Sequence, residues 1–293
     1  MSTNQNQLAL EITGPEDAPV LVLGSSLGAD RHMWDEVVPL LDGWRIVRYD
    51  HPGHGQSAPL SLPTAAGQTC PVTGQRGENL GTDNDAEDVP RHASPADHAD
   101  ALARSLAAAG IEKFHLAGLS LGGMMTLWWA ANRPTDILSA TVMCAGPVIE
   151  PSEAWWDKAQ QVRSEGTGAI VEATLERWFT PSFLEENGPL VQRTRQTYLQ
   201  CSDEGFAQCC EIIATMDNRP DLDRIEVPVG FICAEFDQSL PPRDAHALGE
   251  EIHQRAGVPV KVEEVTDAAH LAAVEQPAAV AAALTRILEH HRS

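Results

Sequence analysis

Short apolar segments alternate with helical segments along most of this 293-residue chain. Most of the short segments are almost wholly apolar, as expected of strands that are buried on both faces. Strands that alternate with helices form a mostly parallel sheet with helices on both faces, so we predict an α/β fold. The expected strands are 8–12, 20–23, 44–49, 114–117, 140–144, 229–233 and 260–265.

Two of the intervening segments concern the domain organisation. Apolar residues recur at helical spacing over 33–41, between the second and third expected strands. Residues 151–217 are almost wholly helical in pattern, with breaks at Pro181 and Pro189, and they lie between two strands of the same sheet. We therefore predict a core of residues 1–148 and 218–293, with residues 149–217 inserted as a helical cap.

The stretch 58–94 shows neither the apolar run of a buried strand nor the spacing of a helix. It is polar, increasingly acidic, and broken repeatedly by glycine and proline. Such a long segment is uncommon in a compact domain, and we favour a flexible surface loop inserted in the core over a covering element. Ser94 and Pro95 then provide an N-cap and a first helical residue, and Gly110 is expected to end that helix.

The charge balance restricts the kinds of partner. The formal net charge is −22, from 42 acidic and 20 basic residues. So acidic a surface repels phosphate backbones and anionic lipids, so we expect no nucleic-acid or membrane partner. The N-terminus lacks the pattern of an export signal, and the cysteines lack metal-ligand or disulfide-framework spacing. We expect a cytoplasmic protein with reduced thiols, and a homo-oligomer stays open.

The pentapeptide Gly118-Leu119-Ser120-Leu121-Gly122 lies between an expected strand and an expected helix. A serine at such a turn adopts strained backbone angles, and the small flanking residues allow neighbouring chain segments to approach it. Its hydroxyl then projects from the end of the sheet. We predict that Ser120 is a nucleophile, for which a plain Gly/Ser turn is the alternative.

A serine hydroxyl needs a histidine base and an acid that orients the base. In a parallel sheet these partners come from the carboxyl ends of strands. Asp237 follows the expected strand 229–233, and His270 follows 260–265. The strand 140–144 has no carboxylate after it, and Asp267 fits a turn better. We predict Asp237 as the acid and His270 as the base. Other histidines fit less well; His51 and His54 lie in a turn that they are expected to shape.

Acyl transfer also requires backbone N–H groups that stabilise the negative charge of the intermediate. One should be the amide of Leu121, directly after the nucleophile. The other should come from the loop Gly24–Gly28, where Ser26 is the first choice and Leu27 the second. That loop is also explained as a tight strand-to-helix connection, and the two roles are compatible.

The chain resembles the α/β-hydrolase superfamily from Leu8 to its final helix. Within the superfamily it resembles the 3-oxoadipate enol-lactonases of the β-ketoadipate pathway of aromatic catabolism. The segments that carry the resemblance are Ser25-Ser26-Leu27-Gly28-Ala29-Asp30, Arg48-Tyr49-Asp50-His51-Pro52-Gly53-His54-Gly55, Gly118-Leu119-Ser120-Leu121-Gly122-Gly123-Met124, Glu176-Arg177-Trp178-Phe179-Thr180-Pro181, and Ala269-His270-Leu271 with Val274-Glu275-Gln276-Pro277.

The resemblance implies a serine hydrolase that opens a small anionic lactone through an acyl-enzyme on Ser120, with no metal and no cofactor. Such a substrate carries a carboxylate, for which Arg31 and Arg177 are the candidate partners. Three other functions use the same triad and remain alternatives: those of a carboxylesterase, a carbon–carbon bond hydrolase and a cofactor-free perhydrolase. A non-catalytic binding scaffold is the alternative from another class, but it would be expected to lack a triad residue.

Overall fold

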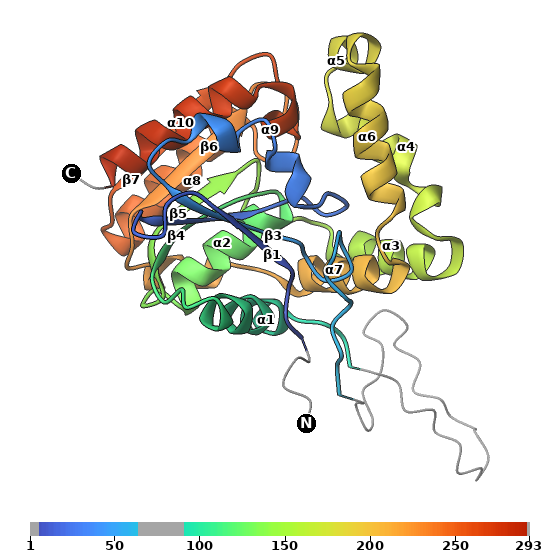
Figure 1. Cartoon of the computed structure of the whole chain (residues 1–293), viewed down its shortest axis with the longest axis horizontal. Helices are drawn as coiled ribbons and strands as arrows, with labels where there is room; N and C mark the ends of the chain where they lie inside the picture. Colours follow the sequence, from blue (N-terminus) through green and yellow to red (C-terminus); the bar gives the residue numbers. More distant parts are fainter. Residues whose placement is uncertain (1–5, 64–90, 292–293) are drawn as a thin grey trace.

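The computed structural model describes residues 6–63 and 91–291 of the chain. Within them, seven strands form one sheet in the order β1-β3-β2-β4-β5-β6-β7 (Figure 1). Only β1 and β3 pair antiparallel. All seven expected strands are confirmed, with ends that differ by a few residues. The strands are Leu10–Thr13 (β1), Val20–Gly24 (β2), Arg45–Tyr49 (β3), Phe114–Leu119 (β4), Ile137–Met143 (β5), Val229–Ala234 (β6) and Val260–Val265 (β7).

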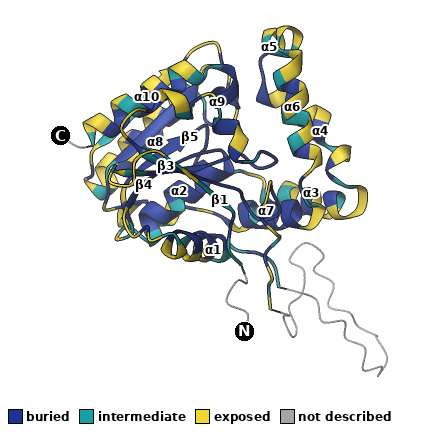
Figure 2. Ribbon diagram, viewed as in Figure 1, coloured by how far each residue is buried: buried dark blue, intermediate teal, exposed yellow. Residues whose placement is uncertain are grey.

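Helices flank the sheet on both faces, as predicted (Figure 1). Every residue of β4 and β6 is buried, which explains why these strands are almost wholly apolar in the sequence, with His115 of β4 as the exception (Figure 2). The core helices are α1 (Pro95–Ala108), α2 (Leu121–Asn132), α8 (Pro242–Ala256), α9 (Ala272–Glu275) and α10 (Pro277–His290).

The helical pattern at 33–41 forms two short 3₁₀ helices instead of an α-helix. These are η1 (Arg31–Trp34) and η2 (Val38–Leu40). Pro39 lies inside the second and has no N–H to donate, so a regular helix cannot continue through it. Met33, Trp34, Val37 and Leu41 are nevertheless buried in the core, as the spacing indicated, whereas Leu40 is exposed.

Five α-helices lie between β5 and β6 in the chain, and we call them the cap helices. Figure 1 shows α4, α5 and α6 standing beside the sheet, while α3 and α7 pack against each other. Pro181 begins α5 and Pro189 is the second residue of α6, which explains the two breaks in the pattern. The cap helices are Ser152–Glu165 (α3), Val171–Trp178 (α4), Pro181–Glu186 (α5), Gly188–Leu199 (α6) and Asp203–Thr215 (α7).

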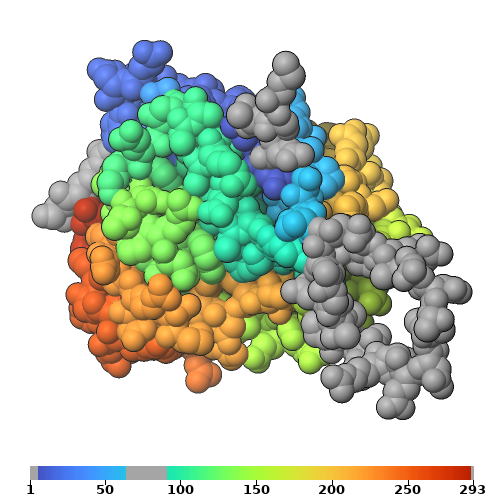
Figure 3. Space-filling model, turned by 90° about the horizontal axis from the view of Figure 1, so that it is seen from below, coloured from blue at the N-terminus to red at the C-terminus, as the bar shows by residue number. Residues whose placement is uncertain are grey.

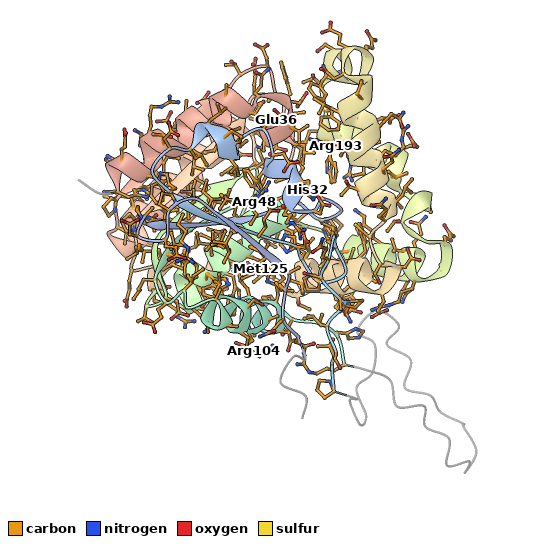
Figure 4. All side chains as sticks on the ribbon, viewed as in Figure 1. His32, Glu36, Arg48, Arg104, Met125 and Arg193 are labelled. Atoms are coloured by element: carbon orange, nitrogen blue, oxygen red, sulfur yellow. The ribbon has the colours of Figure 1, made fainter. Side chains whose placement is uncertain are left out.

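The contacts between the cap helices and the core include two places on α6 and α7. Arg193 of α6 lies 3.9 Å from the Asp35 carboxylate, close to His32 of η1 (Figure 4). At the other place, Gly205 of α7 lies directly against Gly53, and a Cβ on either glycine would overlap the backbone of the other. The backbone contact between Gly53 and Gly205 leaves no room for a side chain at either position.

We expect Gly205→Ala to lower the free energy of unfolding by about 1–3 kcal/mol, because the new methyl group must displace the Gly53 backbone. Urea denaturation measures the change. Gly188→Ala at the start of α6 is the matched control, since no atom lies within 4 Å of its Cβ position. Equal stability of the two variants would show that the Gly53 and Gly205 backbones can move apart without lowering the free energy of unfolding.

The expected polar insertion 58–94 is described only at its two ends. Residues 64–90 lie outside the described residues, so the prediction for them is untested. Ser94 caps α1, accepts from the Asp97 amide and precedes Pro95, as predicted.

Figure 3 shows α1 and the residues after it as a teal-to-green surface, with orange residues of the C-terminal third beside it. Along the described residues, no helix combines the length and apolarity that crossing a membrane requires.

Candidate active site

Ser120 lies at the sharp turn between β4 and α2. Its backbone has φ 59° and ψ −116°, a combination that is strained for a residue with a side chain. Gly118 and Gly122 make the turn possible, because a Cβ on Gly118 would overlap the carbonyl group of Gly122, and one on Gly122 would overlap the Gly24 carbonyl. The pentapeptide therefore forms the strained strand-to-helix turn that places Ser120 on a cavity.

Asp237 and His270 follow β6 and β7 and form a hydrogen-bonded pair. His270 Nδ1 lies 2.8 Å from Asp237 Oδ1, and both side chains are almost fully buried. The carboxylate also accepts from the amides of Ser239 at 3.1 Å and Leu240 at 2.9 Å. Because a carboxylate only accepts, Nδ1 carries a proton, and Nε2 of the neutral ring is free to take one.

Ser120, Asp237 and His270 line a single cavity of about 370 Å³. This volume suits a small-molecule ligand. In the described part of the chain, no group of three or more His, Cys, Asp or Glu side chains is arranged to hold a metal ion. The core also contributes Ser26, Leu27, Gln238 and Ser239 to the cavity, and the cap helices contribute Trp155, Lys158, Thr174, Arg177, Trp178 and Tyr198.

The amides expected to form the oxyanion hole are available. In the hydrogen bonds of the described residues, the N–H groups of Leu121, Ser26 and Leu27 have no protein acceptor. The loop Gly24–Gly28 is docked on the start of α2, because the Gly122 amide donates to the Ser25 carbonyl at 3.0 Å. The geometry is compatible with either second donor, and Ser26 and Leu27 both line the cavity.

Two buried histidines form hydrogen bonds with the backbone of the loop Gly24–Gly28. His51 Nε2 donates to the Ser25 carbonyl at 2.7 Å, and His54 Nε2 accepts from the Gly28 amide at 2.8 Å. Burial lowers the pKa of His54 to about 4, so its ring is neutral near pH 7 and can accept from an amide. We expected these histidines only to shape their own turn; they also position the loop that carries the candidate oxyanion donors.

The two arginines proposed for a substrate carboxylate lie in different places. Arg31 is buried outside the cavity, with Nη1 2.6 Å from Asp50 and Nε 3.0 Å from Glu11. The fully buried Asp50 carboxylate requires a cation, and Arg31 supplies it. We therefore no longer assign Arg31 to substrate binding. Arg177 lines the cavity and stays a candidate.

Lys158 and Trp155 of α3 were missed by the sequence reasoning. The Lys158 ammonium lies 4.0 Å from the centre of the Trp155 ring, which is the geometry of a cation–π contact. A signal was present, because the chain has only three lysines and this one lies beside tryptophans in the helical block. The side of α3 that would face the cavity was not predictable, since it depends on tertiary packing.

Glu275 was also missed as a positioning residue. Its Oε1 accepts from the amide and the hydroxyl of Thr180, each at 2.8 Å, and its Oε2 accepts from the Ala269 amide at 2.6 Å. This buried carboxylate joins the chain between α4 and α5 to the loop that carries His270. The sequence analysis named the segments 176–181 and 274–277 only because they resemble the enol-lactonases. The structure shows that hydrogen bonds connect them.

A family model described as "alpha/beta hydrolase fold" matches residues 19–277. The match contains β2 to β7 together with Ser120, Asp237 and His270. The chain belongs to the α/β-hydrolase family. This assignment confirms the fold that the alternation of strands and helices predicted.

Similar proteins of this α/β-hydrolase family include enol-lactonases and an esterase. "3-oxoadipate enol-lactonase 1" of Acinetobacter baylyi is 32% identical over 280 residues, which are 94% of this chain and 92% of the relative. The crystal structure of the enol-lactonase from Burkholderia xenovorans LB400 has a TM-score of 0.79 and 26% identity, and covers 96% of both chains. A thermophilic esterase from Thermogutta terrifontis has a TM-score of 0.78 and 25% identity, over 98% of this chain and 94% of the esterase. The protein is therefore a hydrolase.

Proposed function

We propose that this hydrolase opens 3-oxoadipate enol-lactone to 3-oxoadipate through an acyl-enzyme on Ser120. The observation that carries the proposal is the hydrogen-bonded pair of Asp237 and His270, which lines one cavity with Ser120. Arg177 on the same cavity suits a substrate that carries a carboxylate. The similarity to two enol-lactonases supports this substrate.

The first half-reaction forms the acyl-enzyme. His270 Nε2 takes the hydroxyl proton of Ser120 while Oγ attacks the lactone carbonyl, and Asp237 stabilises the resulting imidazolium. The amides of Leu121 and of Ser26 or Leu27 donate to the oxyanion. The ring C–O bond then breaks, the leaving oxygen takes the proton from His270, and the resulting enol ketonises to the oxo group.

Water completes the reaction in the second half. His270 takes a proton from a water molecule, whose oxygen attacks the acyl carbon. The bond from that carbon to Ser120 breaks, and the serine oxygen recovers the proton. One lactone and one water thus give one oxo-diacid. We also propose that residues 149–217 act as a cap domain, because they supply one wall of the cavity.

We expect the purified protein to hydrolyse 3-oxoadipate enol-lactone with a kcat/KM about 100-fold or more above that for 4-nitrophenyl acetate. A pocket with polar groups placed for one substrate discriminates strongly against a substrate that leaves them unpaired. Steady-state kinetics on both substrates makes the comparison. A preference for the aryl ester would exclude the lactonase assignment.

A carboxylesterase is the second candidate function. The similarity to the Thermogutta terrifontis esterase favours it, because that structure covers the chain as completely as the enol-lactonase does. The triad is common to both activities, so substrate preference decides between them. Faster hydrolysis of aryl or alkyl esters than of the lactone would support this candidate.

A further inference from the structure

Two cations of the cap helices face the cavity, and neither has a carboxylate partner among the described residues. Lys158 of α3 and Arg177 of α4 both line it. In the described part of the chain, the contact of Lys158 is with the Trp155 ring, and Arg177 donates to the Ala173 carbonyl at 3.4 Å. Neither forms a salt bridge with a described carboxylate.

This lack of partners is unusual for such an acidic chain. With 42 acidic and 20 basic residues, carboxylates are abundant, and most of the described arginines form ion pairs. Arg163 of the same helix α3 contacts both Glu204 and Glu211 at 2.8 Å. Glu150 also lines the cavity, but its carboxylate pairs with Arg219 at 3.0 Å. The cavity therefore keeps two cations that no carboxylate of residues 6–63 and 91–291 neutralises.

The position of Lys158 has an energetic consequence. Burial, together with the nearby charge of Arg177, lowers the pKa of the Lys158 ammonium. A partly buried charge without an anionic partner costs free energy in the empty site. A bound anion would compensate that cost by forming charge-assisted hydrogen bonds with both cations.

We propose that Lys158 and Arg177 together form an anion site that binds a carboxylate group of the substrate. The Trp155 ring supports Lys158 beside the cavity. The carboxylate on this site and the reacting carbonyl at Ser120 then lie at two ends of one short molecule. The chemical class of the ligand is a short aliphatic carboxylate, open-chain or lactone, that carries a second acyl group at its other end. The identity of the substrate rests on the proposed function, whereas the anion site itself does not.

The kinetic test compares a charged with a neutral substrate. We expect Lys158→Met to raise KM for the enol-lactone about 10- to 100-fold, because one charge-assisted hydrogen bond is lost. The increase should exceed that for neutral 4-nitrophenyl acetate by at least about tenfold. Lys158→Arg should restore most of the affinity, and Arg177→Met should resemble Lys158→Met. Equal effects of Lys158→Met on both substrates would exclude the proposal.

The control is a lysine at the other end of the sheet. Lys113 directly precedes β4, whereas Ser120 follows it, so Lys113→Met should change neither KM. If Lys113→Met has the same selective effect as Lys158→Met, the effect comes from the net charge of the protein and the local site is excluded.

A binding measurement separates this proposal from the proposed function. Isothermal titration calorimetry with adipate and with neutral adipamide tests the anion site even if the enol-lactone is not a substrate. Wild-type protein should bind adipate at least about tenfold more tightly than adipamide, and Lys158→Met should reduce that ratio about tenfold or more. Equal affinity for the two compounds in the wild type would overturn the anion site. Adipate selectivity without lactone hydrolysis would overturn only the lactonase function.

Discussion

Ser120→Ala is expected to reduce kcat for the enol-lactone by roughly 10⁴- to 10⁶-fold while the fold is retained. The substitution removes the oxygen that forms the acyl-enzyme and leaves the cavity otherwise unchanged. The strained backbone at this position already carries a Cβ, so alanine adds no new conflict. Steady-state kinetics gives kcat, and circular dichroism with thermal unfolding checks the fold.

A control serine makes the Ser120 result specific. Ser164 lies exposed on α3 and donates to the Gln160 carbonyl away from the cavity, so Ser164→Ala should keep full activity. An organofluorophosphonate probe should label the wild type and Ser164→Ala, but not Ser120→Ala. If Ser120→Ala keeps more than about a tenth of the activity, the acyl-enzyme mechanism is excluded.

The strand pattern was predictable because it is local. A strand buried on both faces must be apolar along its length, and a parallel sheet then places the residues after each strand at one edge. That rule, with the serine motif and the need of a serine for a histidine and an acid, predicted that Ser120, Asp237 and His270 share one site, and the pairing of Asp237 with His270 agrees with it. The glycines around Ser120 were informative because the turn has no room for side chains there.

Pairing of charges is a different kind of property. Arg31 closely follows the loop Gly24–Gly28 in sequence, but its side chain pairs with the buried Asp50 carboxylate, and nothing in the local pattern indicates that contact. Lys158 is separated in sequence from every core residue that lines the cavity, and it reaches the site only through the packing of the cap helices. Charged side chains are long and their partners are set by tertiary structure, so sequence spacing alone could not choose among the cations.

Asp237→Asn is expected to lower kcat by about 10³- to 10⁴-fold. The carboxylate accepts from His270 and Ser239 on Oδ1 and from Leu240 on Oδ2. An amide offers only one acceptor oxygen, so one orientation leaves the Leu240 amide facing an NH₂ group. The other orientation presents the NH₂ group to Nδ1, which favours the wrong tautomer and protonates Nε2. Either way, a base that is correctly oriented and unprotonated becomes rare.

Asp267→Asn provides the decisive comparison, because Asp267 lies three residues before His270 in the sequence. Asp267 has φ 54°, a backbone conformation that asparagine tolerates well, so the control variant should fold normally. Asp267 forms no described contact with His270, and we expect its kcat to stay within about twofold of wild type. Kinetics on the two variants at one pH measures the difference. Equal losses would show that the charge of the loop matters and not the hydrogen bond to Nδ1, because the two substitutions remove the same charge.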